Sequence, residues 1–298
     1  MERLTPEMIG MDRISPTQLQ SYEDCPLNFY YQCWLGLKLE DDRMHMEFGN
    51  AVQRAIEMIY GLYDNHFGGA WEAEEKDGFK KVENVFKQNW PKSRVPELSF
   101  NKFMSTKAGK ESGFTTKEEL YDQMYNEGIT ILKSYWKEKE ILLTQYGLDF
   151  GLDDFEIMIR IDMVNPADPT EKLPIPISGR IDATTRKRDK LIDFKTSKGA
   201  YNAEDSRKLM QCRAYPFMWW MKEKKLITKF DYVVLRKGLV SEDRIQVVSL
   251  EFDEADMLAF YEQVKSIITK IANREFARRS VGHTNFCDCY KFDKMLTI

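Results

Sequence analysis

The chain has 298 residues, of which 43% are hydrophobic and 31% charged, and its formal net charge is -4. This composition is typical of a globular protein with a sizeable core and excludes a disordered chain. No apolar run approaches the roughly 18 residues of a membrane span, and the first residues lack the apolar core of a signal peptide. We therefore expect a cytoplasmic protein, in which a local basic groove is still compatible with the slight acidic excess.

The first half of the chain is predicted to be mainly helical. Ser15 and Pro16 are typical of a helix cap and first helical position, and Pro26 restarts or kinks the helix that they begin. Apolar residues recur at helical spacing between positions 48 and 63. The region 64–150 is also mostly helical, with a polar and weakly patterned middle, and we interpret it as a helical insertion or arch.

From residue 155 the pattern changes to short Ile-rich segments, which predict strands over 155–164, 173–185 and 190–197. A helix is expected over 206–224, followed by strands over 230–237 and 244–252. The closing helix begins at Asp253, which fits the cap position. The predicted fold class is α/β, with a mixed central β-sheet flanked by helices. We divide the chain into N-terminal helices (1–63), a helical insertion (64–150) and the core sheet with its flanking helices (151–298).

The segment ISGRIDATTRKRDKLIDFKTSKG, residues 177–199, carries two acids and a lysine in otherwise apolar strands. Asp193 and Lys195 share one face of a strand, because residues two apart point the same way. If the two strands pair across the basic turn, Asp182 approaches Asp193. Two carboxylates at that range favour a divalent cation between them. The alternative is a structural ion pair with Lys195. We favour the metal site because all three residues occur together.

The same segment resembles the core of PD-(D/E)XK nucleases, specifically the RecB-like branch found in CRISPR-associated and phage nucleases. The string GRID…LIDFKTS is more specific than the generic D…DxK spacing. Its matching residues are Gly179, Asp182, Asp193, Phe194, Lys195 and Thr196.

Three further segments occur in the order of that branch. The N-terminal motif matches at Ser15, Leu19, Tyr22, Cys25, Pro26, Phe29 and Tyr30, the segment EFGNAVQRAIE is similar to a motif helix, and a Q-x-x-x-Y helix matches at Gln211 and Tyr215. The resemblance spans roughly residues 14–220 without the insertion. It implies a restriction-endonuclease-like core.

The resemblance also implies a function: a metal-dependent DNA nuclease, most simply an exonuclease acting at DNA ends in recombination, repair or replication. Asp182 and Asp193 would hold Mg²⁺ or Mn²⁺, and Lys195 would assist the attacking water. Gln211 and Tyr215 would orient the lysine or contact the strand. DNA is the expected partner. The sequence has no helicase motif, so any motor or recombination protein would be a separate chain.

Two departures from the family pattern concern metal ligands. The family's motif histidine falls on Gln53, whose carbonyl oxygen is a weaker ligand for Mg²⁺. Glu57, one turn further along, is a possible substitute, although we favour reading it as an ordinary surface glutamate. Gln53 is therefore assigned to the metal site with Asp182 and Asp193.

The second departure concerns the five cysteines. Iron–sulfur members of the branch pair the N-terminal cysteine with three C-terminal cysteines, whereas this chain offers Cys287 and Cys289 alone at its C-terminus. An iron–sulfur cluster is therefore not expected. Cys33 or His283 could complete a ligand set, but we favour reading Cys25 as a small buried residue.

An alternative function is a DNA-binding or assembly subunit that keeps the nuclease fold with weak or no catalysis. Gln53 supports it, whereas the intact acids and lysine oppose it. Aromatic residues could stack on bases, namely Tyr201, Trp219 and Trp220, but helix packing is the preferred reading of the tryptophan pair.

Overall fold

The computed structural model describes residues 5–38, 43–66, 75–238, 244–278 and 287–296. Its centre is a five-stranded sheet in the order β1-β2-β3-β4-β5. The strands are β1 Phe155–Ile161, β2 Ile177–Thr184, β3 Lys190–Ser197, β4 Lys229–Arg236 and β5 Ile245–Glu251. All neighbours pair antiparallel except β3 and β4, which are parallel. The mixed sheet confirms the predicted α/β class.

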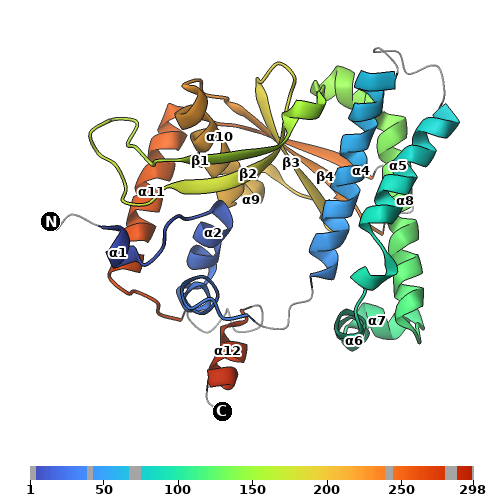
Figure 1. Ribbon diagram of the computed structural model, residues 1–298, viewed down its shortest axis with the longest axis horizontal. Coiled ribbons are helices and arrows are strands. Elements are labelled where there is room, and N and C mark those ends of the chain that lie inside the picture. The colour runs from blue at the N-terminus through green and yellow to red at the C-terminus, as the bar shows by residue number, and fades with distance from the viewer. Residues whose placement is uncertain (1–4, 39–42, 67–74, 239–243, 279–286, 297–298) are drawn as a thin grey trace.

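Helices cover both faces of the sheet (Figure 1). Their bounds are α1 Pro6–Ile9, α2 Pro16–Asp24, α3 Pro26–Phe29, α4 Met44–His66, α5 Glu75–Asn89, α6 Glu97–Ser105, α7 Lys107–Ser112, α8 Lys117–Tyr146, α9 Ala203–Arg207, α10 Met210–Glu223, α11 Glu254–Ala272 and α12 Cys289–Leu296. Short π and 3-10 turns are Tyr30–Trp34, Lys92–Arg94 and Leu152–Asp154. None of the described helices is long and apolar enough to cross a bilayer.

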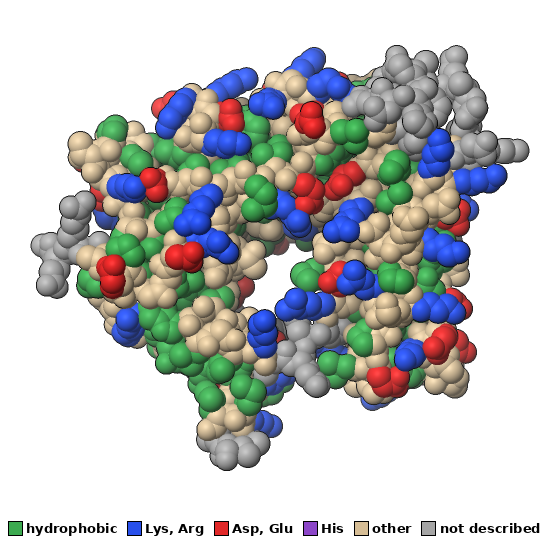
Figure 2. Space-filling model, viewed as in Figure 1, with side chains coloured by type: hydrophobic (Ala, Val, Ile, Leu, Met, Phe, Trp, Pro, Cys, Tyr) green, Lys and Arg blue, Asp and Glu red, His purple; other side chains and the backbone are tan. Residues whose placement is uncertain are grey.

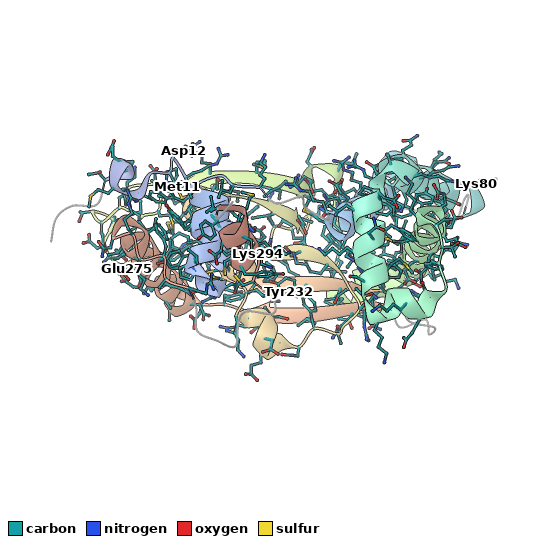
Figure 3. All side chains as sticks on the ribbon, turned by 90° about the horizontal axis from the view of Figure 1, so that it is seen from below. Met11, Asp12, Lys80, Tyr232, Glu275 and Lys294 are labelled. Atoms are coloured by element: carbon teal, nitrogen blue, oxygen red, sulfur yellow. The ribbon has the colours of Figure 1, made fainter. Side chains whose placement is uncertain are left out.

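The two faces of the sheet bury separate apolar clusters. One contains residues of α2, α10 and α11, such as Leu19, Phe217 and Phe260. The other contains residues of α4, α5 and α8. Neighbouring residues of β4 alternate between them, because Tyr232 belongs to the first cluster and Val233 to the second. Seen from below, Lys80 of α5 lies at one end of the molecule and Glu275 at the other, with Tyr232 between them (Figure 3).

Most predicted elements are present, and the differences have local causes. The strand expected from 173 begins at Ile177, because Pro174 and Pro176 lack the N–H of a ladder residue. The helix expected from 206 is divided into α9 and α10. Pro216 lies inside α10 without ending it. Asp253 caps α11 as predicted, since its side chain accepts a hydrogen bond from the amide of Asp256.

The region 64–150 is largely helical where it is described, with α5 to α8 between residues 75 and 146. Helices α5, α6 and α8 pack with α4 and the sheet in one continuous apolar cluster. The division of the chain at residues 63 and 150 remains a prediction.

Helix α2 is fixed to the sheet at its first turn. Ser15 and Gln18 form a reciprocal capping box, and Ile14 pairs with Ile177 at the start of β2. Gly179 permits this contact: a Cβ there would lie 3.4 Å from Pro16 and 3.3 Å from Met218. The glycine of the GRID string therefore allows two helices to approach the strand that carries Asp182.

Candidate active site

The site is built where β2 and β3 separate. Their ladder pairs Thr184 with Leu191 and Ala183 with Ile192. At the next position, Oδ2 of Asp182 accepts a hydrogen bond from the amide of Phe194 at 2.9 Å. The Asp182 carboxylate thus accepts the hydrogen bond that a backbone carbonyl would accept in a regular β-ladder. This contact brings Asp182 beside Asp193.

Asp193 and Lys195 lie on the α10 face of β3, as their spacing predicted. Their side chains form an ion pair with an Oδ2–Nζ distance of 2.5 Å. Phe194 points the other way and contacts the rings of Tyr135 and Phe150 in the second apolar cluster. Because alternate side chains of β3 point to opposite faces of the sheet, the charged residues lie on one face and Phe194 packs in the core on the other.

The Asp193 carboxylate is fully buried. Apart from the ion pair with Lys195, neither of its oxygens has a hydrogen-bond partner within the described part of the chain. Burial raises the pKa of Asp193, and the nearby Lys195 opposes that rise. Burial, and secondarily the charge of Asp193, raises the pKa of Asp182 to about 8. Without a cation, both carboxylates thus resist ionisation.

Lys195 is held by more than its ion pair. Its Nζ donates to Oε1 of Gln211 at 3.0 Å, and Nε2 of Gln211 donates to the Tyr215 hydroxyl at 3.2 Å. Both partners lie one turn apart on α10, as the Q-x-x-x-Y pattern predicted. Burial disfavours the ammonium, but the charges of Asp193 and Asp182 outweigh it and raise the pKa of Lys195.

A second polar group lies between α4 and β1. Nε2 of Gln53 donates to Oε1 of Glu156 at 2.8 Å, and Oε2 of Glu156 pairs with Nη1 of Arg180 at 2.6 Å. Glu156 also contributes to the raised pKa of Asp182 through its charge. The side-chain amide of Gln53 thus donates an N–H to the carboxylate of Glu156. That its carbonyl oxygen binds the metal remains a prediction.

Glu57 is not the surface glutamate that we favoured from the sequence. Its Oε1 is buried and has no hydrogen-bond partner among described residues. Burial, and then the charge of Glu156, raises the pKa of Glu57 to about 7. The apolar stripe of α4 directs it inward, so that it becomes a further candidate for a cation ligand.

Glu156 escaped the sequence prediction. The register pairs Phe155 with Ala183 and Ile157 with Ile181, which places Glu156 across from Asp182. Its backbone adopts φ 55°, an uncommon conformation for a residue with a side chain. The alternating strand pattern does not predict this backbone conformation. The one signal in the sequence is an acidic residue among Ile-rich neighbours.

The two tryptophan candidates pack in the core, whereas base stacking by Tyr201 remains a prediction. Trp219 is 3% exposed and, with half-buried Trp220, packs in the first apolar cluster, which confirms the packing interpretation. Tyr201 is half-buried against the ring of Tyr232, with centroids 5.6 Å apart. Its backbone exchanges two hydrogen bonds with the side chain of Gln246.

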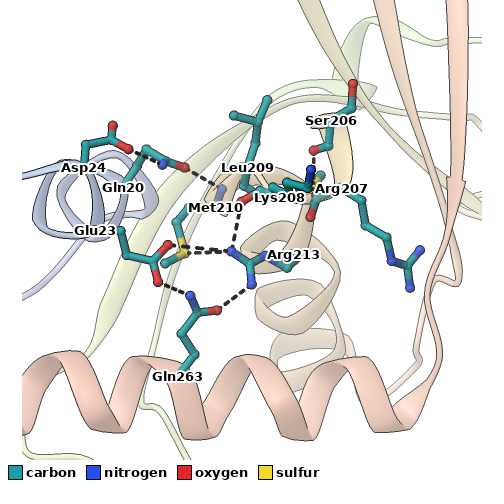
Figure 4. A network of polar contacts seen from close by, with 11 residues as sticks. Gln20, Glu23, Asp24, Ser206, Arg207, Lys208, Leu209, Met210, Arg213 and Gln263 are labelled. Carbon is teal, nitrogen blue, oxygen red and sulfur yellow. Dashed lines mark hydrogen bonds and ion pairs between the residues drawn. The ribbon is translucent and has the colours of Figure 1, made fainter. Parts of the chain in front are cut away.

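Helix α10 is anchored by a network that reaches α2 and α11 (Figure 4). Oε1 of Gln20 accepts from the first amide of α10, at Met210, over 2.9 Å. Arg213 donates to Gln263 at 2.5 Å and to the carbonyl of Lys208 at 3.0 Å, and Gln263 donates to Glu23. The network fixes the helix that carries Gln211 and Tyr215.

A pocket of about 690 Å³ lies at the carboxyl ends of β3 and β4, between the sheet and α6 to α8. Phe48 and Phe103 contribute apolar walls, and Lys198 and Lys237 line it directly after the strands. Gly49 brings α4 against β3 beside it, because a Cβ there would lie 3.2 Å from Oγ1 of Thr196. Figure 2 shows the molecule hollowed between its two helical sides, with Lys and Arg side chains along the rim.

Comparison with known proteins identifies the superfamily of the chain. A sequence model described as "PD-(D/E)XK nuclease superfamily" matches residues 13–291. No curated protein gives a significant match. A crystal structure described as "Putative exonuclease", from Eubacterium rectale, aligns over 98% of this chain and 94% of its own, with 11% identity and a TM-score of 0.50. Another, of SSO0001, aligns over 64% of this chain and 92% of its own, with 13% identity and a TM-score of 0.29.

Proposed function

Because the chain belongs to the PD-(D/E)XK nuclease superfamily, we propose that it is a metal-dependent deoxyribonuclease that hydrolyses phosphodiester bonds at DNA ends. The observation that carries the proposal is the Asp193 carboxylate, fully buried beside Asp182 with Lys195 as its sole polar partner in the described chain. A buried acid with unsatisfied oxygens is costly unless a cation occupies the site.

The side chains present fit Mg²⁺ or Mn²⁺. Asp182 and Asp193 offer carboxylate oxygens, and Glu57 and Gln53 offer further hard oxygen ligands from α4. A bound divalent cation supplies Lewis acidity and an acidified water. The protein holds these donors on two strands and one long helix, and their side chains would have to move closer together to bind one ion, because no three acidic side chains among the described residues have oxygens within 4.8 Å of one another.

Lys195 acts as a fixed positive charge. Against the effect of burial, the charges of Asp193 and Asp182 raise the pKa of Lys195, and as an ammonium it would orient water and offset charge that develops on the phosphate. Gln211 accepts one of its three N–H bonds at 3.0 Å and holds the group on the α10 side of the strand.

The DNA strand is proposed to follow the pocket at the ends of β3 and β4. Lys198 and Lys237 suit phosphates, and the partly buried Phe103 suits a base face, which is the combination that binds single strands. The acids Glu111 and Glu127 also line the pocket, but Lys107 lies 3.7 Å from Glu111 and Arg244 pairs with Glu127 at 2.5 Å. A single strand leaving a DNA end fits this combination of charge and apolar wall.

The test is digestion of end-labelled linear DNA and covalently closed DNA, each single- and double-stranded, with Mg²⁺, Mn²⁺ or EDTA. We expect metal-dependent release of short labelled products from linear DNA and no cleavage of closed circles. Asp193→Asn is the matched control, because the amide keeps the shape of the side chain and loses its charge. Cleavage of closed circles would contradict the exonuclease assignment, and undiminished activity of Asp193→Asn would contradict the active site.

A second candidate is a DNA-binding or assembly subunit with weak catalysis. Gln53 supports it, because a neutral amide stands where the family pattern has a histidine. This candidate predicts DNA binding that is the same with metal, with EDTA and in Asp193→Asn, without cleavage in any of them.

A further inference from the structure

Three cysteines that are distant in the sequence meet away from the proposed active site. Cys25 lies between α2 and α3, whereas Cys287 and Cys289 lie at the start of α12. Their Sγ atoms all lie within 4.8 Å of one another. Their exposed fractions are 2%, 7% and 4%. Cys25 is therefore more than the small buried residue expected beside Pro26, because tertiary structure adds it to the C-D-C pair.

We propose that Cys25, Cys287 and Cys289 bind one thiophilic divalent cation, with Zn²⁺ as the natural occupant. Tetrahedral zinc with Zn–S bonds of about 2.3 Å places sulfurs about 3.8 Å apart, which the observed cluster reaches by small side-chain rotations. On binding, each thiol releases its proton to solvent and forms a Zn–S bond. A water or another ligand takes the fourth position. A disulfide, in contrast, would use two of the sulfurs and leave the third unpaired.

The remaining cysteines do not extend this site to a four-thiolate cluster. Cys212 is fully buried in the core of α10, where its Sγ donates to backbone carbonyls such as that of Ser206. Cys33 packs against the first apolar cluster, and the trio forms a separate cluster with Leu27 and Tyr31. His283 lies outside the described residues. Because iron–sulfur cubanes are held by four cysteines, this donor set fits a single ion better.

The proposed ion would fasten the C-terminal helix to the N-terminal helices. Helix α12 has eight residues, too few to be stable alone in water. Its contacts to the N-terminal segment include those of Tyr31, whose hydroxyl donates to Asp293 at 2.8 Å and whose ring lies 5.3 Å from that of Phe292. A metal–thiolate site would add folding free energy at this junction.

The test uses the full chain, purified under reducing and anaerobic conditions and titrated with Co²⁺ in place of Zn²⁺. We expect stoichiometric Co²⁺ binding with thiolate-to-cobalt charge-transfer absorption, which Zn²⁺ then abolishes. Cys25→Ser and Cys289→Ser should weaken this absorption at least tenfold per added metal, whereas Cys33→Ser, the matched control, should leave it unchanged. Absence of the absorption in the wild-type protein, or stoichiometric iron and sulfide instead of zinc, would overturn the proposal.

Hydrogen exchange gives a readout that needs no variant. Removing the metal from the wild-type protein with a chelator should accelerate amide exchange in α12 and leave α11 unchanged. Equal rates of amide exchange in α12 with and without the metal would contradict the proposal that the metal holds α12 against the N-terminal helices. Neither experiment depends on nuclease activity, so failure of one proposal is distinguishable from failure of the other.

Discussion

The raised pKa of Asp182 makes the free energy of unfolding depend on pH. Its folded-state pKa of about 8 lies above the value of about 3.9 of an unfolded aspartate. The folded chain therefore binds a proton that the unfolded chain releases above about pH 4. The resulting stabilisation is fully present below pH 4 and is lost as the pH rises through about 8.

We predict that Asp182→Asn stabilises the metal-free protein at alkaline pH. The neutral amide oxygen can still accept from Phe194, and the cost of a buried charge disappears. The expected gain is about 1–3 kcal/mol at pH 9, with little change at pH 4, measured by urea unfolding in EDTA. Asp162→Asn is the control, since Asp162 is 57% exposed at its side chain. A gain of equal size at both pH values would contradict the raised pKa.

The two candidate ligands on α4 are separable by metal titration of the cleavage rate. Glu57→Gln should raise the half-saturating Mg²⁺ concentration about tenfold or more, because it removes the charge of an otherwise unpartnered oxygen. Gln53→Ala should also weaken metal binding more than it lowers the saturated rate, and Gln53→His should preserve activity. If Gln53→Ala titrates like wild type and Glu57→Gln does not, the ligand from α4 is Glu57.

How far the sequence predicted this site depends on what kind of contact is involved. Asp182, Asp193 and Lys195 were predictable because strand alternation and one short turn place them, and Gln211 with Tyr215 followed from helical spacing. Glu57 was misread because burial depends on how α4 packs against β1. Glu156 was missed because its position beside Asp182 depends on a left-handed backbone conformation within a strand. The local sequence pattern does not predict that conformation.

At the scale of elements, α10 shows how a side chain of the candidate site depends on distant anchors. Arg213 and Gln20 touch neither Asp193 nor Lys195 in any described hydrogen bond, yet they hold the helix from which Gln211 reaches Lys195. The sequence predicted the helix but not the network, because its partners lie on α2 and α11, about 190 and 50 residues away.

We predict that Arg213→Ala lowers the maximal cleavage rate while metal affinity stays near that of wild type. The loss of bonds to Gln263 and to the carbonyl of Lys208 frees one side of α10 and should cost about 1–2 kcal/mol of stability. Urea unfolding and metal titration together check this. Arg160→Ala, at an exposed position of β1, is the matched control. If Arg213→Ala lowers metal affinity as much as it lowers the cleavage rate, Arg213 contributes directly to the metal site.

At the scale of the whole molecule, the positive charge of the pocket at the ends of β3 and β4 should govern DNA affinity although the protein is acidic overall. The double variant Lys198→Ala, Lys237→Ala should bind single-stranded DNA more weakly, with the slope of log affinity against log salt reduced by about 0.7 per lost phosphate contact. Lys225→Ala is the control, because Lys225 precedes β4 whereas Lys237 follows it. Binding is measured with metal-free protein, and an unchanged slope would exclude this path for the strand.

The junction between α12 and the N-terminal helices also bears on synthesis of the chain. Tyr31 and Asp293 are separated by 262 positions, and α2 packs on α10 and α11, which are translated much later. The apolar faces made first on the ribosome therefore wait for partners that are synthesised about 190 residues later. During that interval α2 and α3 are surfaces that chaperones can hold. A translation-arrest sequence placed directly after residue 298, which keeps residues 287–296 in the exit tunnel, should lengthen the wait.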